Sequence, residues 1–202
     1  MSASVSIGSR FAAAVEFAID AHQGDVRKGT TIPYLSHLLQ VAGLVLEYGG
    51  TEEEAIGAML HDAAEDAGGE AMLAEIESRF GSVVESIVRE NSDSLTESKE
   101  AKAPWRQRKE AYVFAISHKS ESACLVSICD KIHNCRSLIA DTRNHGEVHW
   151  QRFNAGKDEV FWYYSSLLEA FAGRLADAPR LRTAFHELQI ATSELGLLIR
   201  DA

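Results

Sequence analysis

Hydrophobic and polar residues follow the period of an α-helix along almost the whole chain. Apolar side chains recur every three or four residues, which places them on one face of a helix. No segment shows the pattern of a parallel β-sheet. We therefore expect an all-α bundle, with helices over residues 11–19, 35–47, 51–66, 72–80, 83–88, 105–116, 122–139, 160–175 and 181–199.

Local signals mark some of the helix boundaries. Gly49 and Gly50 follow the second predicted helix, where glycine commonly ends one. Thr51 and Glu54 have the spacing of a capping box, which begins the next helix. Residues 92–102 are polar and charged without a helical period, so they predict a long loop over the functional site. The sequence leaves open whether this loop closes on a ligand.

Length and composition favour one globular domain over residues 1–202. The chain is 46% hydrophobic and has only three prolines, as expected for a helical protein with one substantial core. No stretch approaches the ~20 consecutive apolar residues of a membrane span. The N-terminus also lacks the basic and apolar regions of a secretory signal. We therefore expect a cytoplasmic protein without a membrane partner.

The formal net charge of −10 restricts the partners further. Broad nucleic-acid binding needs a positive surface that releases phosphate counterions, so no nucleic-acid partner is expected. An acidic protein can still bind a polyphosphate where basic residues converge locally. The composition permits a homo-oligomer without indicating one.

Cys124, Cys129 and Cys135 lie five and six residues apart within one predicted helix. This spacing suits neither a disulfide framework nor a paired zinc site. We expect buried, unpaired thiols in a reducing compartment.

The pair His61-Asp62 is the strongest candidate for chemistry, and the acidic pair Glu65-Asp66 follows it. On a helix, these four positions fall at roughly 0°, 100°, 40° and 140°, so they share one side. The preceding residues are mostly small or apolar, and ionisable groups are costly to bury there without a cation or partners. A divalent metal ion prefers such carboxylate and imidazole ligands. The alternative is a helix end that emerges into solvent at Gly68.

Two other helices carry isolated polar residues. His37 lies near the start of an apolar helix, just after Pro33, and a lone histidine there is either a packed residue or a ligand. Asp130 lies within the apolar stretch 123–132. A buried, unpaired aspartate is costly, so Asp130 requires a cation or a dense set of hydrogen bonds.

The order His37, His61-Asp62, Asp130 resembles the HD-domain metal-dependent phosphohydrolases. The chain looks closest to the hydrolase domain of RelA/SpoT-type enzymes and to the free-standing small alarmone hydrolases. The resemblance covers about residues 10–165, and helices over 157–200 complete the bundle. Matching stretches are Ala21-His22, Val26-Arg27-Lys28-Gly29, Ile32-Pro33-Tyr34-Leu35-Ser36-His37, Leu60-His61-Asp62, Glu65-Asp66, Phe80-Gly81 and Cys129-Asp130-Lys131-Ile132-His133-Asn134.

This resemblance implies hydrolysis of the 3′-pyrophosphate of guanosine tetra- or pentaphosphate to GDP or GTP. A divalent ion, Mn²⁺ in the family, would neutralise charge and activate water; other divalent ions remain open. The resemblance assigns the catalytic role of base or water positioning to Glu65 and Asp66, for which the alternative is an acidic helix end. The implied metal ligands are His37, His61, Asp62 and Asp130.

The resemblance also implies nucleotide contacts. Arg27 and Lys28 match a pair that packs along the base and ribose. Asn134 lies four residues past Asp130, on the same helical face, and matches a nucleotide-contacting asparagine. Tyr34 is a candidate to pack beneath the base, or else it fills the core. Arg108 and Lys109 are candidates for phosphate contacts, or else they form a solvated charge pair. Lys157 and the aromatic residues 161–164 are candidates to close the nucleotide pocket, although ordinary packing also explains the aromatic residues.

Two departures from the long family members concern the substrate. One extra residue lies between Lys28 and His37. Residues 90–94 also lack the basic side chain that those enzymes carry. The phosphate contacts and the preferred nucleotide therefore stay open.

Three alternative functions differ from this one in substrate or in role. The same metal site would suit another nucleotide phosphohydrolase, acting on adenosine alarmones, NADPH or nucleoside monophosphates. A non-catalytic sensor would show a broken ligand set or lack Glu65-Asp66, and neither defect is present. Synthetase activity needs a second domain, for which the hydrolase match leaves no room.

Overall fold

The computed structural model describes residues 6–95, 103–153 and 155–201. Within these ranges the regular elements are helical, apart from one isolated antiparallel bridge between Val26 and Pro33. The predicted all-α fold is confirmed. The helices are α1 (Ser9–Ala21), α2 (Leu35–Glu47), α3 (Glu52–Leu60), α4 (Ala63–Ala67), α5 (Gly69–Phe80), α6 (Ser82–Asn91), α7 (Trp105–Ala115), α8 (Glu121–His145), α9 (Lys157–Arg174) and α10 (Arg182–Asp201), with 3-10 turns η2 (Ile116–His118), η3 (Gly146–Arg152) and η4 (Pro179–Leu181).

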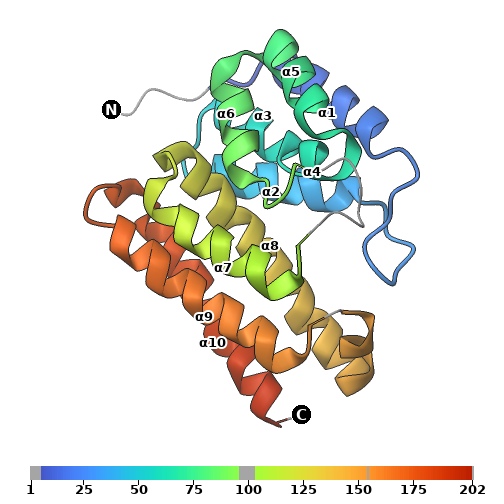
Figure 1. Cartoon of the computed structure of the whole chain (residues 1–202), viewed down its shortest axis with the longest axis vertical. Coiled ribbons are helices and arrows are strands. Elements are labelled where there is room, and N and C mark those ends of the chain that lie inside the picture. The colour runs from blue at the N-terminus through green and yellow to red at the C-terminus, as the bar shows by residue number, and fades with distance from the viewer. Residues whose placement is uncertain (1–5, 96–102, 154, 202) are drawn as a thin grey trace.

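Helix α8 is the centre of the fold. It packs against α2, α3 and α6 as well as α10. Figure 1 shows α1 to α6 on one side of α8, with α9 and α10 on the other. Most of its residues between Ala123 and Ile132 are buried, so any polar group there is held away from bulk water. The three cysteines of this helix are buried and unpaired, as expected.

The predicted capping box fixes the start of α3. The Glu54 backbone N–H donates to the Thr51 hydroxyl at 3.2 Å, and the Thr51 N–H donates to the Glu54 carboxylate at 2.8 Å. Glu54 is buried and also pairs with Arg180 from η4. Burial alone would raise the pKa of Glu54, but the Arg180 bond and the other donors lower it. This contact joins the N-terminus of α3 to η4, which directly precedes α10.

The prediction of a single helix over residues 51–66 is wrong. Helix α3 ends at Leu60, residues 61–62 form a turn, and α4 begins at Ala63. The imidazole of His61 bonds back to the Ala58 carbonyl, with 2.8 Å between Nδ1 and oxygen. This bond draws the ring across the end of α3. His61 and Asp62 keep right-handed helical backbone angles, with φ and ψ of −59° and −28° and of −97° and −9°, so the chain breaks the helix by a single turn.

The start of the predicted loop over residues 92–102 is described only as far as Leu95. Residues 96–102 lie outside the described part of the chain, so the expected loop stays a prediction. Among the described helices, none combines the length and the apolar composition that a membrane crossing requires.

Candidate active site

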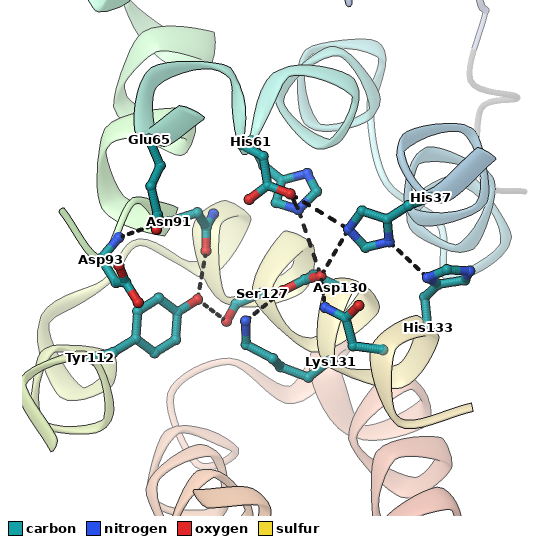
Figure 2. Close-up of polar contacts among 12 residues, drawn as sticks. His37, His61, Glu65, Asn91, Asp93, Tyr112, Ser127, Asp130, Lys131 and His133 are labelled. Carbon is teal, nitrogen blue, oxygen red and sulfur yellow. Dashed lines mark hydrogen bonds and ion pairs between the residues drawn. The ribbon is translucent and has the colours of Figure 1, made fainter. Parts of the chain in front are cut away.

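Three separate elements bring the four predicted ligands together. Helix α2 supplies His37, the turn after α3 supplies His61 and Asp62, and α8 supplies Asp130. His37 Nε2 lies 3.2 Å from Asp130 Oδ1 and 3.6 Å from Asp62 Oδ2. His61 Nε2 lies 3.1 Å from Asp62 Oδ2 and 3.6 Å from Asp130 Oδ1. Figure 2 shows both imidazoles directed towards Asp130.

Both imidazoles present an unsatisfied nitrogen to this centre. His37 Nε2 and His61 Nε2 are buried and have no partner in hydrogen-bond geometry. Their Nδ1 atoms are engaged elsewhere, by the His133 Nδ1 at 2.7 Å and by the Ala58 carbonyl at 2.8 Å. One ligand atom from each of His37, His61 and Asp62 lies within 4.8 Å of the others. The donor set and the unpartnered nitrogens therefore fit a divalent ion.

Asp130 has the partners that its burial requires. Lys131 Nζ donates to Oδ2 at 2.5 Å and the Asn134 amide donates to Oδ1 at 2.5 Å. Arg27 in turn donates to the Asn134 amide oxygen at 3.0 Å. Burial lowers the pKa of Lys131, but the Asp130 carboxylate outweighs this and raises it well above its usual value. Asp130 is therefore held as an anion by a neighbour that the sequence interpretation missed.

The histidine and aspartate side chains of this centre shift one another's pKa values. Burial lowers the pKa of His61, yet the carboxylates of Asp62 and Asp130 raise it well above its ordinary value. Burial raises the pKa of Asp62, but His61 and His37 hold it well below its ordinary value. The charges of these side chains therefore stabilise one another, and a divalent ion would bind His61 in its neutral form.

Tyr34 has a contact that sequence interpretation did not find. Its hydroxyl donates to Asp62 Oδ2 at 2.5 Å. The ring lies against His22 and His37, with centroids 5.1 and 5.4 Å apart. Tyr34 therefore orients one of the predicted ligands. The only sequence signal was its position three residues before His37.

Glu65 is linked to a charged cluster at the start of the loop after α6. The Asp93 backbone N–H donates to Glu65 Oε2 at 3.3 Å. The Asp93 carboxylate, only 3% exposed, binds Arg108 and Lys109 at 2.6 Å. Burial raises the pKa of Asp93, but these two cations hold it well below its usual range. The backbone of Asp66 lies in α4, whereas its side chain is outside what the structure describes.

These groups line a cavity of about 240 Å³. Four acidic and two lysine side chains face it, so the cavity itself favours an added cation. Sequence interpretation missed Lys131, Asn91, Asp93 and Tyr112; only Lys131, next to Asp130 in an apolar helix, carried a signal. The lining is Tyr34, His61, Asp62, Glu65, Asn91, Asp93, Lys109, Tyr112, Asp130, Lys131 and Asn134.

The other predicted substrate residues do not line this cavity. Arg27 reaches its edge through Asn134, and Arg108 through Asp93. Lys28 is exposed, with its Nζ 5.8 Å from the centroid of the Phe153 ring. Lys157 pairs with Glu147 of η3. In the aromatic run 161–164, the two tyrosines are buried, as ordinary packing predicts.

The profile of the HD domain family matches residues 14–156, and the chain belongs to this family. HD domains bind divalent metals, and the cluster of His37, His61 and Asp62 is in place for one. Among curated relatives, the guanosine-3′,5′-bis(diphosphate) 3′-pyrophosphohydrolase MESH1 of Xenopus tropicalis is 35% identical over 128 residues, covering 62% of this chain and 67% of the relative. The Homo sapiens MESH1 is 34% identical over 130 residues, with the same coverages.

Solved structures share the fold. A metazoan ortholog of SpoT that hydrolyses ppGpp superposes with a TM-score of 0.69 at 22% identity, over 95% of this chain and 96% of that one. A protein of Listeria monocytogenes EGD-e gives 0.67 at 24% identity, over 82% and 99%. The helical arrangement around the site is therefore shared by these proteins.

Proposed function

We propose that this protein is a metal-dependent phosphohydrolase of the small alarmone hydrolase type. Its substrate would be guanosine 3′,5′-bis(diphosphate) or the corresponding pentaphosphate, cleaved to pyrophosphate and GDP or GTP. The observation that carries the proposal is the pair of buried, unpartnered Nε2 atoms of His37 and His61 facing two carboxylates. MESH1 relatives, named as 3′-pyrophosphohydrolases, support the choice of substrate.

The proposed metal ligands are His37, His61, Asp62 and Asp130. A divalent ion bound there supplies neutralisation of phosphate charge and activation of water. We propose Mn²⁺, because mixed imidazole and carboxylate ligation suits it. Tyr34 and Lys131 keep the two carboxylates oriented through their bonds to Asp62 and Asp130.

We propose Glu65 as the residue that orients the attacking water and takes its proton. Water attacks the phosphorus joined to the 3′ oxygen, the O3′–P bond breaks, and the 3′ oxygen takes up a proton as pyrophosphate leaves. Glu65 lines the cavity and is held by the Asp93 N–H. Asp66 stays a predicted second member of this pair.

The cavity is too small to hold the whole nucleotide, so we propose that different residues bind its phosphates and its nucleoside. At about 240 Å³, it is smaller than the ~300–1,000 Å³ of typical ligand pockets. The 3′-diphosphate would enter it, near Lys109 and Lys131. The nucleoside would lie at the edge of the cavity, against Arg27 and Asn134, with Lys28 beside it.

Arg108 is proposed as a support for the phosphate contacts of Lys109, since both bind Asp93. Lys157 would contact the substrate only after its ion pair with Glu147 breaks. The buried, unpaired cysteines support the proposal of a reducing, cytoplasmic setting.

The test is a substrate panel with chelator-stripped protein. Guanosine 3′,5′-bis(diphosphate), its adenosine counterpart, NADPH and a nucleoside monophosphate are each incubated with and without Mn²⁺, and products are separated by anion exchange. Manganese-dependent release of pyrophosphate with GDP is expected, and the Asp130→Asn protein serves as the inactive control. Turnover of NADPH or the monophosphate alone would replace the proposed substrate, and turnover without any divalent ion would contradict the mechanism.

A further inference from the structure

A second histidine lies directly behind the proposed ligand His37. His133 of α8 and His37 of α2 are both buried, and their Nδ1 atoms are 2.7 Å apart. The ring centroids are 4.8 Å apart with an interplanar angle of 43°. Figure 2 shows this contact at one nitrogen of the His37 ring, whereas the other nitrogen points towards Asp130. An Nδ1–Nδ1 distance of 2.7 Å is a hydrogen bond, so one proton lies between these two nitrogens.

The chemistry of His37 decides which ring carries that proton. Its Nε2 faces the two carboxylates and has no hydrogen-bond partner. To bind a metal ion, Nε2 must offer its lone pair, so the one proton of the neutral ring is on Nδ1. His37 is therefore the donor, and His133 Nδ1 accepts with its lone pair.

The other proposed histidine ligand has the same arrangement. His61 Nδ1 lies 2.8 Å from the Ala58 carbonyl oxygen, which can only accept a hydrogen bond. Both imidazoles thus have an acceptor behind Nδ1 and a free Nε2 in front. For His61 the acceptor is backbone, whereas for His37 it is a side chain that can be replaced.

We propose that His133 is a positioning residue for the metal site, whose Nδ1 accepts the proton of His37 and so fixes the tautomer and the direction of the His37 ring. This inference rests on the metal site of the proposed function. Hydrogen-bond partners of metal-bound histidines typically change metal affinity by ~10–100-fold when they are lost. The direct hydrogen bond and ring contact between His133 and the proposed ligands are both made with His37.

His133 is only 8% exposed, but it borders a groove at the surface. Together with Leu39, Glu47 and Arg136 it lines a groove of about 660 Å³ between α2 and α8. Truncation of His133 to alanine would open a space that continues into this groove. Added imidazole can then occupy the place of the lost ring.

The first experiment measures metal affinity rather than turnover. Chelator-stripped wild type, His133→Leu and His133→Asn are titrated with Mn²⁺ by calorimetry or competition with a chelating dye. We expect His133→Leu to weaken binding by roughly 10–100-fold. His133→Asn should stay within about threefold of wild type, because its amide oxygen can accept at the place of Nδ1. His145→Leu, an exposed histidine at the end of the same helix, controls for loss of an imidazole.

The outcomes separate a hydrogen-bonding role from a packing role. Wild-type affinity in His133→Leu overturns the proposal, and so does an equal loss in the Leu and Asn variants. Recovery of His133→Ala affinity on addition of imidazole supports it. Where a variant does not fold, the wild type still decides: ¹⁵N imidazole spectra of the zinc-loaded protein must show the proton of His37 on Nδ1.

The same measurements keep this inference apart from the proposed function. A wild-type protein that binds no divalent ion contradicts both. A wild-type protein that binds the ion and responds to the His133 variants, yet releases no pyrophosphate from the alarmone, contradicts only the proposed substrate.

Discussion

Replacing Asp93 by asparagine tests the charged cluster that holds Glu65. The Asp93 carboxylate is 3% exposed, and its oxygens lie 2.6 and 2.7 Å from Arg108 Nη1 and 2.6 Å from Lys109 Nζ. Arg108 and Lys109 are 18% and 19% exposed. The substitution keeps the shape of the side chain and removes its charge.

The expected loss of stability follows from these contacts. A hydrogen bond between charged groups contributes ~1.5–3 kcal/mol, and breaking a fully buried pair costs ~3–5 kcal/mol. Because both cations keep some contact with water and asparagine retains one acceptor oxygen, we expect Asp93→Asn to lower the free energy of unfolding by about 2–4 kcal/mol. For a protein of this size the melting temperature then falls by roughly 5–15 °C.

The pH dependence gives the prediction a second signature. Lys109 and Arg108 hold the pKa of folded Asp93 well below its usual value, against the opposing effect of burial. A depressed folded pKa means that the carboxylate stabilises the protein above the unfolded pKa of ~3.9 and loses this contribution as the pH falls below it. The difference between wild type and Asp93→Asn should therefore be full at pH 7 and shrink below about pH 4.

Denaturant unfolding at pH 7 and pH 3.5, followed by circular dichroism, measures both effects. Glu110→Gln breaks an exposed pair with Arg106 on the same helix as the two cations, so its loss should stay under ~1 kcal/mol. A loss under ~1 kcal/mol in Asp93→Asn at pH 7, or a difference that does not change with pH, would refute this account of the cluster.

Three further predictions concern the site. Asp130→Ala should lose both metal binding and turnover, whereas Glu65→Gln should keep its metal affinity and slow hydrolysis by at least ~100-fold. Wild-type turnover in metal-free Asp130→Ala would contradict the assignment of the site. Tyr34→Phe removes the 2.5 Å bond to Asp62, and a loss of ~1–2 kcal/mol should weaken Mn²⁺ binding about 5–30-fold, measured by calorimetry; an unchanged affinity would show that this bond does not orient the ligand. Mn²⁺ at 100 times its dissociation constant should stabilise the chelator-stripped protein by ~2.7 kcal/mol, seen as a higher melting temperature than in EDTA, and identical melting curves would exclude tight binding to the folded state.

The sequence predicted the elements that depend on local physics. Helical periodicity located most of the helices to within a few residues, and the hydrogen bonds of Thr51 and Glu54 formed as their spacing predicted. The burial of His61 and Asp130 also followed from their apolar surroundings. These features depend on residues a few positions apart, so they can be predicted from the sequence without knowledge of the tertiary structure.

Local pattern failed where a side chain competed with the backbone. Periodicity continued the helix through His61 and Asp62, but the structure has a turn there, with the His61 ring bonded to the Ala58 carbonyl. Hydrophobic periodicity records which face is buried. The pattern of hydrophobic residues contains no information on a hydrogen bond between a side chain and a nearby backbone carbonyl.

The sequence by itself determined an all-α chain and the residue types of a metal site: two histidines and two aspartates, each near an apolar helix. Only the tertiary structure decided their partners, because contacts between residues far apart in the chain depend on how the helices pack. His133 meets His37 across 96 positions, and Asp93 meets Lys109 across 16. The packing of α2 against α8 brings His37 within hydrogen-bond distance of His133.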